Sequence, residues 1–288
     1  MKTITLCSLL FAAVASCQQP PPVQPAQPDN PDKTADAQKV LDEVKASFAK
    51  EKIQLDAKEQ TVTIPVLVNR PQDPVEYLLI NRRGKRHEAV FVTTCKPSVL
   101  NAALLMLGLT PGKNASYVEK QPPPTLEEIE KGADPIIITP PEGVPFWMTA
   151  KWKNPDGKQV EHCIEDLLLD LSTQKPVDGC SWVFLGGRMA RLYKDEPEVY
   201  VADFEGNLIS TCYLSPDNHL GTMVHKDARD DQNWWITSVL PDPELEIEVQ
   251  LVFHRREPAL HKERGERLRR EAEEAAKKPA ESREDKDR

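Results

Sequence analysis

The pair His87-Glu88 is the first group of side chains in this sequence that could do acid–base chemistry. An imidazole and a carboxylate held together can pass a proton to or from a substrate. The surrounding pattern predicts that the pair begins a β-strand, where adjacent side chains point to opposite faces. The two groups could not then act on one atom. We therefore favour a structural role, in which a half-buried His87 fixes a hairpin.

A second group lies in one polar loop and consists of His219, His225, Asp227, Asp230 and Asp231. Imidazole nitrogens and carboxylate oxygens bind divalent cations, so this loop could serve a metal-dependent hydrolase. However, no EF-hand pattern is present, aspartates are ordinary turn residues, and Lys226 and Arg229 add competing positive charge. We therefore expect neither a metal nor another cofactor.

No catalytic motif accompanies these residues. The sequence has no nucleophile elbow, phosphate-binding loop, dinucleotide fingerprint or zinc-protease helix. The net charge of −9 argues against nucleic-acid binding, which requires a basic surface. A non-catalytic binding or structural domain is therefore favoured over an enzyme.

The N-terminus carries the pattern of an exported protein. An apolar segment, 4–14, follows Lys2 and is too short to span a bilayer. It ends in Val14-Ala15-Ser16-Cys17, which resembles the lipobox of bacterial lipoproteins. That resemblance implies cleavage before Cys17, acyl chains such as palmitate on this residue, and anchoring to the periplasmic face of the outer membrane, given Gln18. The alternative is an ordinary secretory signal that leaves Cys17 with a free thiol.

The rest of the chain divides by composition. After the signal peptide of residues 1–16, a lipidated cysteine and proline-rich linker occupy 17–34, where prolines favour an extended spacer. A folded domain follows over 35–256. The tail of residues 257–288 is almost entirely Glu, Lys, Arg and Ala. Because it lacks a continuous apolar stripe, we expect it to be solvated, partly helical and partly disordered.

The pattern of the folded domain predicts a single α+β domain rich in antiparallel β-hairpins. Apolar spacing predicts an N-terminal helix over 35–50, one well-defined buried helix over 97–107 and a short helix over 164–171, with a brief turn over 126–131 in a loop-rich stretch. Three hairpins with glycine at the turn are predicted over 76–92, 146–162 and 199–212. Alternating strands are also expected at 53–55, 62–66, 182–185 and 245–253.

Several strings within this domain resemble the YdjY domain family. They are EYLLI from residue 76, GKRHEAV from 84, KPS from 96, AALLMLGLTPG from 102, SWVFLGG from 181 and VYVADFEGNLI from 199. The resemblance covers about residues 50–255 and implies an exported protein of planctomycete-type bacteria. The family brings no known catalytic residues. A ferredoxin-like label sometimes attached to it would imply a redox carrier, and Cys95 departs from its pattern, which implies a disulfide particular to this lineage.

Four cysteines remain in the folded domain, namely Cys95, Cys163, Cys180 and Cys212. Iron–sulfur and structural zinc sites use closely spaced ligands, which these residues do not provide, and this disfavours the redox carrier. An even number of dispersed cysteines in an exported chain is typical of disulfides. Of the three pairings, we favour Cys163–Cys180 with Cys95–Cys212; four buried free thiols are the alternative.

The sequence therefore favours a lipid-anchored cell-envelope protein. Its partners would be a membrane, reached through the lipid on Cys17, and an envelope protein or glycan bound by the folded domain. The alternatives are a metal-dependent hydrolase that uses the loop at 219–231, with or without His87, and a redox protein.

Overall fold

The structure is a computed structural model that describes residues 31–214 and 219–277. The signal segment, Cys17 and most of the proline-rich linker lie outside the described residues. The chain divides into two compact units, Met1–Asp42 and Glu43–Arg288. Helix α1 (Pro31–Lys50) begins in the first unit and ends in the second; it starts at a proline, which suits a first helical turn, and Gln38 donates a hydrogen bond to Asp42 at 2.9 Å. This confirms the predicted N-terminal helix.

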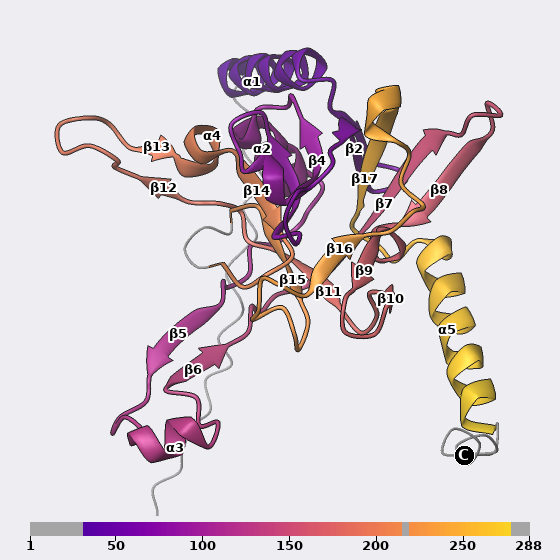
Figure 1. Ribbon diagram of the computed structural model, residues 1–288. Helices are drawn as coiled ribbons and strands as arrows, with labels where there is room; N and C mark the ends of the chain where they lie inside the picture. The colour runs from indigo at the N-terminus through magenta and orange to yellow at the C-terminus, as the bar shows by residue number, and fades with distance from the viewer. Residues whose placement is uncertain (1–30, 215–218, 278–288) are drawn as a thin grey trace, which may run out of the picture. The chain divides into compact units, whose positions relative to one another are not determined.

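The second unit is built around a closed β-barrel (Figure 1). One sheet contains ten strands, of which β1 (Gln54–Asp56) and β8 (Gln159–Cys163) each pair with one neighbour only. The other strands close on themselves because the last of them also pairs with the first. In spatial order they are β2 (Thr61–Val68), β17 (Glu248–His254), β7 (Pro145–Lys153), β11 (Ser181–Phe184), β15 (Gly221–Val224), β14 (Asn207–Ser210), β3 (Tyr77–Asn81) and β4 (Ala89–Thr93).

Apolar alternation fills the inside of this barrel. Val62, Ile64, Val66 and Val68 of β2 are buried, and the positions between them are more exposed. Leu251 and Phe253 of β17 are fully buried in the same core. Because successive strand residues face opposite sides, the polar residues between these positions lie on the outer face of the barrel.

Two helices pack on the core of this unit. The end of α1 contributes the buried Phe48, and α2 (Pro97–Met106) contributes Leu100, Ala103 and Leu104. Asp203 caps the start of α2, since its carboxylate accepts hydrogen bonds from the Ser98 amide at 2.8 Å and the Ser98 hydroxyl at 2.7 Å. Gly108 follows the helix in the left-handed region, at a φ of 89°. The predicted buried helix is thus confirmed.

Smaller elements surround the barrel. β5 (Ser116–Glu119) and β6 (Ile136–Thr139) form a two-stranded ribbon that carries α3 (Leu126–Glu130) between them, as Figure 1 shows. The remaining short elements are β9 (Leu168–Asp170), β10 (Lys175–Pro176), β12 (Met189–Ala190), β13 (Val199–Tyr200), β16 (Trp234–Ile236), the helix α4 (Val201–Glu205), and the 3-10 turns η1 (Arg86–Glu88), η2 (Ile164–Leu167) and η3 (Pro243–Leu245).

The α+β class is confirmed, but the description as a set of antiparallel hairpins needs correction. Only the hairpin at 146–162 forms, as β7 paired with β8. β3 and β4 are parallel, because residues 82–88 carry the chain back so that Ala89 pairs with Tyr77. At 199–212, Gly206 closes α4 instead of a hairpin, and β14 then pairs in parallel with β15. Residues 164–171 form η2 and β9, not an α-helix.

The charged tail begins with helix α5 (Ala259–Lys277), which contacts β8 (Figure 1). Most of the helix is exposed, as predicted for a solvated tail. However, Arg264 is 7% exposed, because its guanidinium bonds to the Asp166 carboxylate at 2.7 Å and the Val177 carbonyl at 2.6 Å. A helix without an apolar stripe therefore docks through polar contacts.

Candidate functional site

An open groove of about 990 Å³ runs over the outer face of β1, β2, β17, β7 and β8, up to the start of α5. We call it the outer-face groove. It is lined by residues 54–59, Thr61, Thr63, Lys151, Glu161, Val252, His254 and residues 256–260. Thr149 of β7 stands opposite both Val252 and Cys163 in the strand register, so it shares this outer face.

A chain of hydrogen bonds lies along one side of the groove. The Thr149 hydroxyl donates to Glu161 Oε1 at 2.6 Å and is 2.9 Å from His254 Nε2. Because the only hydrogen of the hydroxyl is used in the bond to Glu161, the hydroxyl oxygen accepts from Nε2, which must therefore carry a hydrogen. Burial lowers the pKa of His254 to about 4 against the raising effect of Glu161, so the ring is neutral at pH 7.

This hydrogen-bonded chain is a support and not a nucleophile with its base. Thr149 is fully buried, so its hydroxyl cannot reach a substrate in the groove. Thr149 fixes the position of Glu161 across the β7–β8 strand pair and that of His254 across the β17–β7 strand pair. The result is a rigid polar wall for whatever enters the groove.

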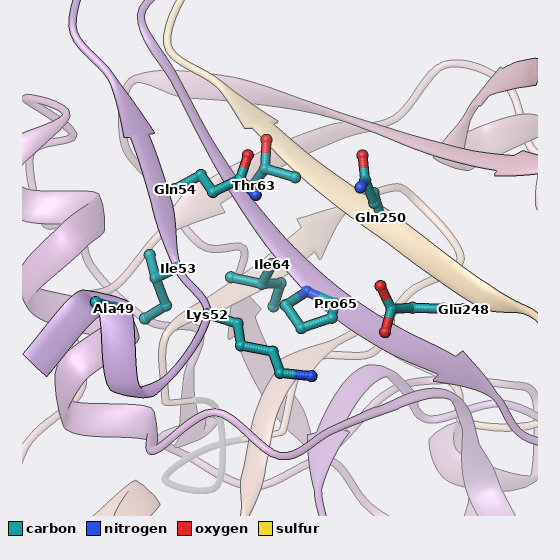
Figure 2. Close-up of a pocket in the computed structure, with 9 residues that line it drawn as sticks. All are labelled: Ala49, Lys52, Ile53, Gln54, Thr63, Ile64, Pro65, Glu248 and Gln250. Atoms are coloured by element: carbon teal, nitrogen blue, oxygen red, sulfur yellow. The ribbon is translucent and has the colours of Figure 1, made fainter.

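A second hollow of about 370 Å³ continues the groove toward the end of α1. Gln54 and Thr63 line both hollows. Figure 2 shows Gln54 and Thr63 next to each other on β1 and β2, and Gln250 farther along on β17, where it is paired with Pro65. Polar groups therefore continue across the outer faces of three adjacent strands.

The groove carries exposed charges of both signs. Lys58 and Arg256 are positive, and Asp56, Glu59 and Glu257 are negative. No Phe, Tyr or Trp side chain lines it. The surface therefore suits a ligand that carries charges and hydrogen-bonding groups along its length.

His87 and Glu88 lie elsewhere, in η1. Because η1 is a helical turn and not a strand, the two side chains contact each other, with His87 Nε2 3.2 Å from Glu88 Oε1. The expectation of opposite faces is therefore wrong; the His87 side chain is 51% exposed and lies in a helical turn, not on a hairpin strand. Glu88 also pairs with Lys85 at 3.4 Å. These contacts form a surface ion-pair cluster.

The polar loop brings His225 and Asp227 together, with His225 Nδ1 3.8 Å from Asp227 Oδ2, whereas His219 pairs with a residue outside the loop. His219 is fully buried, and its Nε2 is 2.7 Å from the carboxylate of Glu205 in α4. His225 lies edge-on to the Trp234 ring at 5.1 Å, and its Nδ1 accepts a hydrogen bond from the Asp227 amide at 3.2 Å. Each histidine thus has structural partners of its own, and the loop forms no ligand set of three among the described residues.

The four cysteines of the folded domain are free thiols, so the predicted disulfides are not formed in the structure. Cys95 donates to the Glu51 carbonyl at 3.1 Å, and Cys212 donates to the Asp230 carbonyl at 3.6 Å, so the two thiols of that predicted pair have separate acceptors. Burial raises the pKa of Cys163 and of Cys212 to about 12. Both thiols are therefore protonated at pH 7.

Sequence reasoning missed one group of candidate ligands. Cys163, Glu165 and His261 come together where α5 meets β8, and this is the one such group among the described residues. Cys163 and Glu165 are two positions apart in the sequence. His261, however, is on α5, in the tail that the sequence predicts to be solvated. Its docking through Arg264 could not be inferred from hydrophobic periodicity.

The family model of the YdjY domain matches residues 53–231, more than half of the chain. The chain therefore belongs to the YdjY domain family, as its motifs indicated. Comparison with curated proteins and with solved structures gave no match. Among the described residues, no helix has the length and apolar character needed to cross a membrane.

Proposed function

We propose that this chain is a lipid-anchored cell-envelope protein whose YdjY domain binds an extended segment of a partner protein in the outer-face groove. The observation that carries the proposal is the groove itself, a long open surface with charges of both signs and a fixed polar wall. The domain acts by binding and does not catalyse a reaction.

The strands beside the groove favour a polypeptide as the ligand. β1 and β8 each pair on one side only among the described strands, so each has backbone groups available on its other edge. An extended peptide can add to such an edge through main-chain hydrogen bonds, with side-chain contacts giving specificity. A glycan is less well suited, because the groove has no Trp, Tyr or Phe ring on which a sugar could stack.

The candidate catalytic groups support binding over catalysis. Thr149 and His219 are fully buried, and each is occupied by partners within the fold. His87 is exposed, but its neighbours are surface ion pairs. No nucleophile is held next to a base at an accessible position in any of these places.

Membrane attachment in this proposal rests on the sequence. The lipobox-like string ending at Cys17 and the prolines after it fit a domain held away from a membrane by a spacer. Gln18 favours the periplasmic face of the outer membrane. On this basis the groove would face partners in the envelope.

The test compares a groove variant with a surface control in the full chain. Lys58→Glu combined with Arg256→Glu reverses two exposed charges in the groove, and Lys113→Glu reverses an exposed charge outside it. Wild-type, groove and control chains are immobilised and exposed to envelope extract of the producing bacterium. Retained material is identified by mass spectrometry, and a purified candidate is then titrated against all three chains.

We expect one polypeptide partner to bind the wild type and the control with equal affinity and the groove variant at least about tenfold more weakly, the equivalent of 1.4 kcal/mol. Equal binding by all three chains would place the binding surface elsewhere. Retention that survives protease treatment of the extract would identify a glycan and contradict the choice of a polypeptide.

A further inference from the structure

Three side chains of different chemistry converge where α5 meets the barrel. Cys163 is the last residue of β8, Glu165 lies in η2, and His261 lies near the start of α5. The thiol sulfur, a carboxylate oxygen and a ring nitrogen all lie within 4.8 Å of one another. His261 Nε2 is 3.1 Å from Glu165 Oε2.

Two of these ligand atoms are buried without a hydrogen bond. Glu165 is 3% exposed, and its Oε1 accepts a hydrogen bond from the Trp182 indole at 2.8 Å. Its Oε2 and His261 Nε2 are both buried, and their mutual approach does not have hydrogen-bond geometry. Buried polar atoms of native proteins nearly always have a hydrogen-bond partner, so these two atoms, 3.1 Å apart and within 4.8 Å of a thiol sulfur, indicate a shared ligand.

We propose that Cys163, Glu165 and His261 bind a zinc-class divalent ion, which fastens the start of α5 to the barrel. Zinc accepts sulfur, nitrogen and oxygen ligands together at about 2.0–2.3 Å, so tetrahedral ligand atoms lie about 3.3–3.8 Å apart. The nitrogen and the oxygen are 3.1 Å apart and all three atoms lie within 4.8 Å of one another, so a small side-chain adjustment would bring them to that spacing. A thiolate and an imidazole select zinc over magnesium or calcium, and three protein ligands leave the fourth position for water.

The surroundings fit such a site. The indole of Trp182 holds one oxygen of Glu165 and leaves the other for the metal, as outer-shell partners of metal ligands do. The nearby Arg264 is already paired with Asp166 at 2.7 Å, so its charge is balanced within the fold. Zinc binding forms a zinc–sulfur bond and breaks the sulfur–hydrogen bond of Cys163, and the proton goes to solvent, so no further reactant is needed.

The test uses the full chain, zinc ions, and cobalt(II) as a spectroscopic substitute for zinc. Bound metal is measured by elemental analysis after dialysis, and a thiolate-to-cobalt absorption band reports the sulfur ligand without any substitution. Cys163→Ser and His261→Ala remove ligands, and His87→Ala and Cys95→Ala are matched controls for an exposed histidine and a buried thiol. Amide hydrogen exchange in α5 is followed with and without zinc.

We expect one zinc ion per chain and a thiolate-to-cobalt band. Each ligand variant should lose affinity by more than the roughly 10–100-fold that loss of an outer-shell partner costs, and both controls should bind as the wild type does. Zinc should also slow exchange in α5. A folded wild type without stoichiometric zinc, a cobalt complex without the thiolate band, or unchanged binding by His261→Ala would overturn the proposal and leave Glu165 and His261 as a plain ion pair.

Discussion

At the scale of single residues, strand register explains how distant polar side chains meet. Thr149 and Glu161 are 12 residues apart, and Thr149 and His254 are 105 apart, yet the three form one hydrogen-bonded chain. The first contact crosses a hairpin that the sequence predicts. The second depends on β17 pairing with β7, which no local pattern specifies. His254 was therefore not among the candidate residues inferred from the sequence.

The buried ring of His254 should make stability depend on pH. Its pKa in the folded protein, about 4, lies below the ordinary 6.5 because burial outweighs Glu161, while His261 and Lys151 lower it further. Between these two values the unfolded chain binds a proton that the folded chain does not, so the free energy of unfolding falls as the pH is lowered from 6.5 to 4. The loss from this group is roughly 2 kcal/mol, after the partial exposure of the ring is allowed for.

Urea denaturation of the wild type and His254→Gln at several pH values checks this expectation. Glutamine can keep a hydrogen bond to Thr149 but cannot titrate, so the variant should lose less stability than the wild type over this pH range. His87→Gln, at an exposed histidine, should retain the full pH dependence. Equal slopes for the wild type and His254→Gln would show that His254 does not contribute.

At the scale of elements, the sequence predicted those parts whose information is local. The helix at 97–107 has an apolar face, a proline at its start and a glycine after it, and it forms as expected. The sequence predicts hairpin turns at Gly84, within 76–92, and at Gly206, within 199–212. Gly84 instead packs against Gly206 and Asn207, and Gly206 ends a helix. A glycine marks a special backbone conformation, but it does not specify which strand comes next.

The docking of α5 is an element-scale feature that can be tested through Arg264. Its guanidinium holds Asp166, the Val177 carbonyl and, at 3.6 Å, Asp178. Arg264→Ala leaves these acceptors without their donor, so we expect a loss of about 3 kcal/mol in the free energy of unfolding and faster amide exchange along α5. Chemical denaturation and hydrogen–deuterium exchange measure the two effects.

Arg269→Ala is the matched control, because this arginine is exposed on the same helix. It should change stability by less than about 0.5 kcal/mol and leave exchange in α5 unaltered. If Arg264→Ala behaved like the control, the helix would be held by other contacts, and the polar docking described above would be wrong.

At the scale of the whole molecule, barrel closure unites segments that the sequence could not order. The pairing of β2 with both β17 and β4 closes the sheet. β17 and α5 lie beyond the matched residues 53–231, although β17 supplies part of the groove and α5 part of the proposed metal site. Strand order depends on contacts across the whole chain. For this reason the local pattern of apolar and turn residues predicts the α+β class but not the barrel.

We propose that this barrel works while it is tethered to a membrane. The groove can meet partners in the envelope only if the chain is exported and held there. Export depends on the signal segment and retention at the membrane depends on Cys17, both of which lie outside the described residues and are proposed from the sequence. The proposed function at the membrane therefore requires a lipid on Cys17.

Mass spectrometry of the mature N-terminal peptide, isolated from the membrane fraction of bacteria that produce the full chain, tests this claim most directly. We expect a peptide that begins at Cys17 and carries a diacylglycerol thioether, with a further acyl chain on its amine. Cys17→Ala should abolish this modification and shift the protein out of the membrane fraction. A wild-type N-terminus at another residue, with an unmodified thiol at position 17, would contradict the account.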